Sequence, residues 1–159
     1  MLLISDANIF IDLHKIGLLS ICAKLSHQIV TTDFVYNELY KDQRKVLDDL
    51  NIKQLTFEGD EIIDFYTKYS ILGNVGISPQ DYSLIYKAKK IKGSIVTGDK
   101  ALRNYIKKEN LDVFGIFFIF DEILNEELLP LNVWKIKLEE LKNLNDRLPK
   151  KEFEKRLLS

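Results

Sequence analysis

Short apolar runs alternate along the chain with longer stretches in which apolar residues recur at helical spacing. The first run, Leu2-Leu3-Ile4, is of strand type. Strands that alternate with helices in this way predict a parallel sheet covered by helices on both faces. We expect strands over residues 2–4, 28–31, 94–97 and 112–117, with residues 52–57 as a further strand or an extended connection.

Apolar stripes and capping residues predict the helices between these runs. Ser78 is followed by Pro79 and Asp81, a helix start in which serine caps and proline suits the first position. From about residue 118 the chain is expected to be helical, with breaks at Pro130 and Pro149. Other helices are expected through residues 9–13 and over residues 18–25, 34–40, 58–72, 78–91 and 100–108.

These elements predict a three-layer α/β/α fold with a mostly parallel central sheet and a helical C-terminal tail. The 159 residues suffice for one domain with a substantial core, and no repeat or linker-like stretch divides them. We therefore expect a single domain over residues 1–159, with its core in about residues 1–129 and a helical extension over about 130–159. Trp134 and the leucines at helical spacing after it are expected to pack on the domain or on a partner.

Composition narrows the class of protein. Apolar residues make up 46% and charged residues 30%, which excludes a wholly disordered chain. The net charge of -1 excludes a uniformly basic nucleic-acid-binding surface but not a local basic patch. The single cysteine, Cys22, excludes a disulfide framework and fits a reducing cytosol. No apolar run approaches the roughly 20 residues of a membrane span, so we expect a cytoplasmic protein without membrane contact.

Two acidic residues directly follow predicted strands. Asp6 comes after the first apolar run, and Asp99 comes after Ile95-Val96-Thr97-Gly98. Helix capping explains each of them singly, because a helix is expected after each. The carboxyl ends of parallel strands are also where such sheets bind ligands. Two carboxylates that meet there would repel each other and need a compensating cation.

Two further acids lie on predicted helices. Glu38 interrupts the apolar stripe of Phe34, Val35 and Leu39, so we expect it on the face that packs on the sheet, with a cation as partner. An arginine or lysine would serve as well as a metal ion. Asp81 stands at a helix start, where a capping role is an equally good explanation.

Taken together, the four acids favour a hard divalent cation over four separate structural roles. Carboxylate oxygens without a histidine or cysteine cluster suit Mg2+ or Mn2+. Such a site can activate water and stabilise the charge that develops during phosphodiester hydrolysis.

The same residues carry a family resemblance. The motifs, in order, are Leu3-Ile4-Ser5-Asp6-Ala7-Asn8, Val35-Tyr36-Asn37-Glu38-Leu39, Ser78-Pro79-Gln80-Asp81 and Val96-Thr97-Gly98-Asp99-Lys100-Ala101-Leu102-Arg103. With them the chain resembles the PIN domain family from residue 2 to about residue 129. The first and last motifs are the most specific. The stretch from residue 118 to 157 is loosely similar to the helical tail of one toxin-like subfamily.

The resemblance implies an Mg2+- or Mn2+-dependent endoribonuclease, in particular a small toxin of the VapC type in a toxin–antitoxin pair. It implies catalytic roles for Asp6, Glu38, Asp81 and Asp99, with Asp6, Asp81 and Asp99 as metal ligands. Asn8 and Thr97 match supporting residues that orient the carboxylates. Lys100 follows Asp99 where some relatives carry another acid, so one metal ion is expected before two. RNA, an antitoxin protein and a second copy in a homodimer are the implied partners.

Other polar residues give weaker signals. Lysines and arginines dominate residues 87–108, either as a solvated helix face or as a surface that tracks RNA phosphates, with Lys100 and Arg103 nearest the acids. His14 and His27 have no metal-ligand spacing and are expected to be ordinary structural or surface residues. The acids in residues 109–127 are expected to be a solvated surface. Asp12 is as compatible with the surface as with the site.

Two other classes of function compete with the nuclease. A non-catalytic RNA- or protein-binding module of the same fold would be expected to show gaps among the acidic positions, and none is missing. A phosphoacceptor signalling domain would need paired acids after the first strand, but Ser5 precedes Asp6. It would also need a lysine by the last strand, where there is none.

Overall fold

A computed structural model describes residues 1–73 and 75–158 and places five strands in one parallel sheet. The strand order is β3-β2-β1-β4-β5, and every neighbouring pair is parallel. The α/β class with a central parallel sheet is therefore confirmed. The strands are β1 (Leu2–Ser5), β2 (Gln28–Thr32), β3 (Gln54–Leu55), β4 (Ser94–Val96) and β5 (Val113–Phe114).

Strand β1 occupies the centre of the sheet because both of its faces are apolar. Leu3 and Ile4 are fully buried, and as successive strand residues they point to opposite faces. Leu3 belongs to one hydrophobic cluster and Ile4 to the other. Ile4 pairs with Val30 on one side and with Ile95 on the other, so the strand has an apolar neighbour in each direction.

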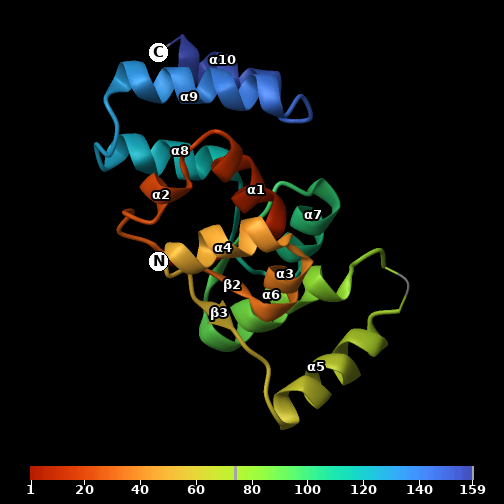
Figure 1. Cartoon of the computed structure of the whole chain (residues 1–159). Coiled ribbons are helices and arrows are strands. Elements are labelled where there is room, and N and C mark those ends of the chain that lie inside the picture. The colour runs from red at the N-terminus through yellow and green to blue at the C-terminus, as the bar shows by residue number, and fades with distance from the viewer. Residues whose placement is uncertain (74, 159) are drawn as a thin grey trace.

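Helices cover one face of the sheet in two tiers (Figure 1). The inner tier comprises α1 (Ala7–Lys15), α2 (Leu19–Cys22), α4 (Lys41–Asp49) and α8 (Ile116–Asn125). The outer tier comprises α9 (Leu131–Leu144) and α10 (Lys150–Leu157), which lie over α8. Trp134 of α9 is buried and its indole N–H donates to the Phe120 carbonyl at 2.7 Å. The tail is thus part of the same hydrophobic core. Of the two packing surfaces expected for Trp134, the domain itself is the one observed.

The opposite face carries α3 (Asp33–Glu38), α5 (Asp60–Ile71), α6 (Pro79–Ile91) and α7 (Lys100–Lys108). Phe65 is fully buried at the centre of an aromatic cluster with Phe34, Phe57, Tyr82 and Tyr86 around it. Tyr82 and Tyr86 are therefore packing residues of this cluster.

Three lysines of α6 are engaged within the fold. Lys87 is buried, pairs with Glu61 and donates to the Thr56 carbonyl at 2.6 Å. Lys90 also pairs with Glu61, and Lys89 pairs with Glu109 at 2.6 Å. The prediction of a phosphate-tracking surface is wrong for Lys87, because the side chain crosses to the loop before α5 instead of reaching solvent.

Three differences between the predicted and the observed elements are the most marked. The sequence pattern did not predict α4, which buries only Leu47 and has a mostly polar sequence. The helix expected over residues 18–25 extends only from Leu19 to Cys22. The strand expected over residues 112–117 ends at Phe114, because Gly115 caps a new helix that begins at Ile116. Among the described helices, none combines the length and apolar character needed to cross a membrane.

Candidate metal centre at the carboxyl edge of the sheet

Asp6 lies directly after β1 and caps helix α1. Its Oδ1 atom accepts a hydrogen bond from the Ile9 amide at 3.1 Å, and its Oδ2 atom accepts one from the Thr97 hydroxyl. The residue is 7% exposed. Its backbone N–H donates to the Val96 carbonyl at 3.1 Å, which continues the pairing of β1 with β4. The strand pairing thus fixes the Asp6 backbone beside the end of β4.

Asp99 occupies the corresponding position after β4. Its Oδ1 atom accepts from the Leu102 amide at 2.8 Å and so caps α7. Its own amide donates to the Thr97 hydroxyl oxygen at 3.2 Å. Thr97 therefore connects the two acidic segments through a single buried hydroxyl. Asp99, unlike Asp6, is an exposed residue.

Asp81 reaches the same edge from helix α6. Ser78 caps that helix and accepts a hydrogen bond from the Asp81 amide at 3.0 Å. The carboxyl group is half-buried, and burial raises its pKa, with a further increase from the negative charge of Asp99. Asp81 and Asp99 both raise the pKa of Asp6 as well. The three carboxyl groups are therefore close enough to interact electrostatically.

Glu38 differs from its prediction. It is exposed and does not lie on the face that packs on the sheet. Helix α3 has only six residues and ends at Glu38, after which Leu39 adopts an extended backbone and turns inward. The apolar stripe is thus formed without Glu38, and the glutamate is left at the rim. Partial burial and the charge of Asp81 still raise its pKa, which places it at the margin of the same group.

The electrostatics of this group suit a cation. Burial, the largest cause, together with the two neighbouring aspartates raises the pKa of Asp6 to about 6, although the Thr97 hydroxyl and the Ile9 amide oppose the shift. None of the ion pairs among the described residues involves Asp6, Glu38, Asp81 or Asp99. A divalent cation would relieve the repulsion, and the oxygen-only donor set fits Mg2+ or Mn2+.

A hollow of about 320 Å³ adjoins Asp99. Asn8, Asp12 and Lys100 line it together with Asn145 and Arg147 of the tail. Asp12 accepts a hydrogen bond from the Asn145 amide group at 2.9 Å, which holds the tail against α1. Asp12 thus lines the hollow beside Asp99, and no motif indicated that Asn145 and Arg147 would reach this hollow. Their separation of more than 130 residues from Asp12 left no local signal.

The predicted residues Asn8, Arg103 and Lys100 differ in their position relative to the hollow. Asn8 is exposed and lines the hollow. Arg103 is half-buried and its guanidinium packs closely against the backbone of Gly115, where a Cβ would come within 3.0 Å of it. Lys100, by contrast, faces the hollow itself.

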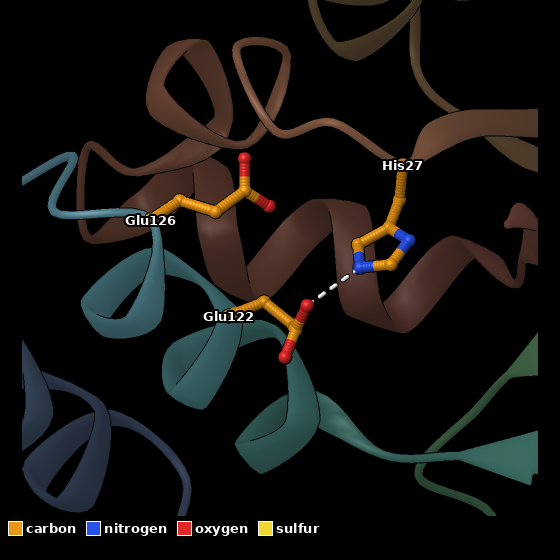
Figure 2. A group of neighbouring side chains, drawn as sticks. All are labelled: His27, Glu122 and Glu126. Atoms are coloured by element: carbon orange, nitrogen blue, oxygen red, sulfur yellow. Dashed lines mark hydrogen bonds and ion pairs between the residues drawn. The ribbon is translucent and has the colours of Figure 1, made fainter.

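A tighter group of metal-ligating side chains occurs elsewhere in the described part of the chain. His27, Glu122 and Glu126 bring one ligand atom each within 4.8 Å of one another, as Figure 2 shows. All three residues are half-buried, so Glu122 and Glu126 are not part of a wholly solvated surface as expected, whereas the pairing of His27 with Glu122 is compatible with the structural role expected of that histidine. Sequence spacing did not reveal it because the histidine lies 95 residues from Glu122.

Comparison with known proteins gives one match, which covers nearly the whole chain. A family model described as "PIN domain" matches residues 2–159. No match was found among curated proteins or among solved structures.

Proposed function

The chain belongs to the PIN domain family, and on that premise we propose that it is a divalent-metal-dependent endoribonuclease that hydrolyses RNA phosphodiester bonds. One observation carries the proposal. The negative charges of Asp81 and Asp99 raise the pKa of Asp6, and that of Asp99 raises the pKa of Asp81, yet none of the three acids takes part in an ion pair among the described residues. Three interacting carboxylates without a cation are costly, and a metal ion explains why the fold brings them together.

In the proposed mechanism Asp6, Asp81 and Asp99 hold Mg2+ or Mn2+. The bound ion supplies positive charge to the phosphodiester and lowers the pKa of the attacking water. Thr97 orients the Asp6 carboxylate through its hydroxyl, and Asn8 supports the same edge. Glu38, exposed at the rim, helps to bind the ion or orients the attacking water.

The hollow beside Asp99 is where we propose that the RNA backbone lies. Lys100 and Arg147 line it and supply positive charge for phosphate groups, which a protein of net charge -1 needs close to its acidic site. Arg103 is the more distant candidate because its guanidinium packs on Gly115. The lysines of α6 that are paired with glutamates are not part of this surface.

We further propose a cytoplasmic toxin role of the VapC type, with an antitoxin protein and a second copy of the chain as partners. The small size of the chain and the loose similarity of residues 118–157 to the helical tail of a toxin-like subfamily support this finer assignment by resemblance. The competing function is a PIN-fold module that binds RNA or protein without cleaving RNA. It predicts no cleavage products, and RNA binding only if its ligand is RNA.

A cleavage assay with a fluorogenic single-stranded RNA tests the proposal. We expect wild-type protein to cleave with Mg2+ or Mn2+ and to stop when EDTA is added. The Asp99→Asn variant should be inactive yet folded, because asparagine caps α7 as well as aspartate does. Asp112→Asn, which changes an exposed acid before β5, is the matched control and should cleave normally.

Two outcomes of this assay would contradict the nuclease. Folded wild-type protein that binds the RNA but leaves it intact with either metal would favour the binding module. Equal cleavage by Asp99→Asn and wild type would indicate a contaminating nuclease or another site.

Replacement of Thr97 by valine is expected to lower cleavage by about 10- to 100-fold, the usual effect of removing a residue that orients a metal ligand. Valine keeps the shape but cannot donate to Asp6, so the carboxylate loses its orientation and its pKa rises further above about 6. Thr97→Ser retains the hydroxyl and should stay close to wild type. The measurement is the pH profile of cleavage, in which the acid limb of the valine variant should shift to higher pH. A valine variant with wild-type activity would remove Thr97 from the mechanism.

A further inference from the structure

We propose that His27, Glu122 and Glu126 form a second metal site that binds a single divalent transition-metal ion. Zn2+ is the ion that best matches these ligands. The site is independent of the proposed nuclease centre. His27 directly precedes β2 and therefore lies at the amino edge of the parallel sheet, whereas Asp6 and Asp99 follow their strands at the carboxyl edge.

The three side chains are arranged as a ligand set. Nε2 of His27 lies 2.6 Å from Oε2 of Glu122, and the third ligand atom, from Glu126, completes a group whose members lie within 4.8 Å of one another. Zn–N and Zn–O bonds of about 2.0–2.2 Å place tetrahedral ligands roughly 3.4 Å apart. Small side-chain rotations would therefore bring all three onto one ion, since the carboxylates and the imidazole face the same space in Figure 2.

The backbone supports this arrangement. Glu122 lies in α8 and Glu126 is the residue that caps its end, one helical turn later. The Glu126 amide donates to the Glu122 carbonyl at 2.9 Å, so the two side chains leave the same face of the helix. His27 reaches them from the segment before β2. The set thus combines two ligands of fixed spacing with one from a distant part of the chain.

Neighbouring groups hold each ligand in place. The Glu126 carboxylate accepts from the Ser26 amide at 2.9 Å and from the Ser26 hydroxyl at 3.0 Å. Oε1 of Glu122 accepts from the Asn125 side chain at 3.2 Å, which leaves Oε2 to face His27. The imidazole packs against Phe118, with ring centroids 5.7 Å apart. Supporting contacts of this kind orient ligands in metal sites and limit the cost of ordering them.

The donor chemistry selects the class of ion. One imidazole nitrogen with two carboxylate oxygens suits Zn2+ and its neighbours in the first transition row, whereas Mg2+ and Ca2+ prefer oxygen alone. Three protein ligands leave a fourth position for water. The ion would join α8 to the segment before β2, two parts of the chain about 95 residues apart. Its expected effect is therefore to stabilise the fold.

Zinc titration of the tag-free, metal-free protein tests the site. We expect calorimetry to show one tight Zn2+ site and the melting temperature to rise by roughly 5–10 °C at a free Zn2+ concentration of about 100 Kd. Co2+ at the same site should give the intense visible absorption of a four-coordinate ion. His27→Gln should weaken binding by at least about 10-fold and remove the Co2+ spectrum.

Three variants make the test specific. His14→Gln changes the other histidine, which is exposed, and should bind Zn2+ as wild type does. Asp99→Asn should also retain the site, which separates it from the nuclease centre. Glu126→Gln keeps a side-chain oxygen for Ser26 and should fold, yet it should lose most of the affinity. Absence of Zn2+ binding by the wild type, or binding that His27→Gln and Glu126→Gln leave unchanged, would overturn the proposal.

Discussion

The Asp6→Asn variant is expected to lose metal-dependent RNA cleavage by at least a hundred-fold while keeping its fold. Loss of a residue that only orients a ligand costs about 10- to 100-fold, and loss of a central ligand should cost more. Asparagine can still accept the Ile9 hydrogen bond that caps α1. The substitution therefore removes the negative charge of Asp6 but keeps its capping of α1. Capping is the alternative explanation for an aspartate at this position.

The same variant should be more stable than wild type at neutral pH when EDTA is present. Burial raises the pKa of Asp6 from 3.8 to about 6, so the folded state disfavours the ionised form. The stability contributed by the protonated carboxyl is fully present below about pH 4 and is lost as the pH rises through about 6. A shift of about two pKa units corresponds to about 3 kcal/mol at most. Asparagine carries no ionisable group, so the unfolding free energy of the variant does not decrease in this way as the pH rises.

Urea unfolding between pH 4 and pH 7.5 measures the effect. The difference in unfolding free energy between Asp6→Asn and wild type should grow with pH and should shrink when Mg2+ or Mn2+ is added to the wild type. Asp112→Asn is again the control. A variant that is less stable than wild type at every pH would show that Asp6 serves the fold. In cells, growth arrest by the wild type and normal growth with Asp6→Asn would support the toxin role.

Trp134→Ala is expected to lower the unfolding free energy by about 3–5 kcal/mol, the usual cost of truncating a large buried aromatic. Trp134 is 2% exposed, packs edge-on against Phe120 and donates to the Phe120 carbonyl. Its removal leaves a cavity between α8 and α9 and removes the indole hydrogen bond to the Phe120 carbonyl. Because Asn145 and Arg147 follow α9 and line the hollow beside Asp99, the variant should also lose cleavage activity before it unfolds.

Chemical denaturation with cleavage assays at each denaturant concentration tests this coupling. Trp134→Phe keeps most of the apolar volume and should cost less than the alanine variant. Leu144→Ala, at a partly exposed position on the same helix, should change stability by much less. Unchanged stability in Trp134→Ala would show that the tail is not part of the folded core.

The sequence predicted those features that have a local signal. Asp6 and Asp99 were identifiable because each follows a short apolar strand and precedes a helix, and the parallel sheet then brings both to one edge. The Ser78-Pro79 start placed Asp81 on a helix in the same way. Glu38 was assigned to the wrong face because the helix ends at Glu38, whereas the apolar stripe continues to Leu39. A periodic pattern does not show where a short helix ends.

Features that depend on contacts between distant segments were missed. The group of His27 with Glu122 and Glu126 joins the segment before β2 to α8, and the two glutamates have no histidine or cysteine near them in the sequence. Arg147 reaches the hollow only because Trp134 and Leu138 dock the tail on α8. Helix α4 is amphipathic but mostly polar, with Leu47 as its one buried residue, so it contains no apolar run that would mark it in the sequence.

The central position of β1 in the sheet also determines when, during synthesis, a new chain can complete its sheet. Leu3 pairs with Ser94, so β1 leaves the ribosome long before its partner on that side exists. At about 5–20 residues per second, synthesis of the intervening segment takes roughly 5–20 s. Asp99 is made only after that. During this interval β1 can pair with β2, but its other side, which pairs with β4 in the folded protein, has no partner and the carboxyl edge is incomplete. A chaperone or a binding partner thus has several seconds to bind the nascent chain before the carboxyl edge with Asp99 is complete.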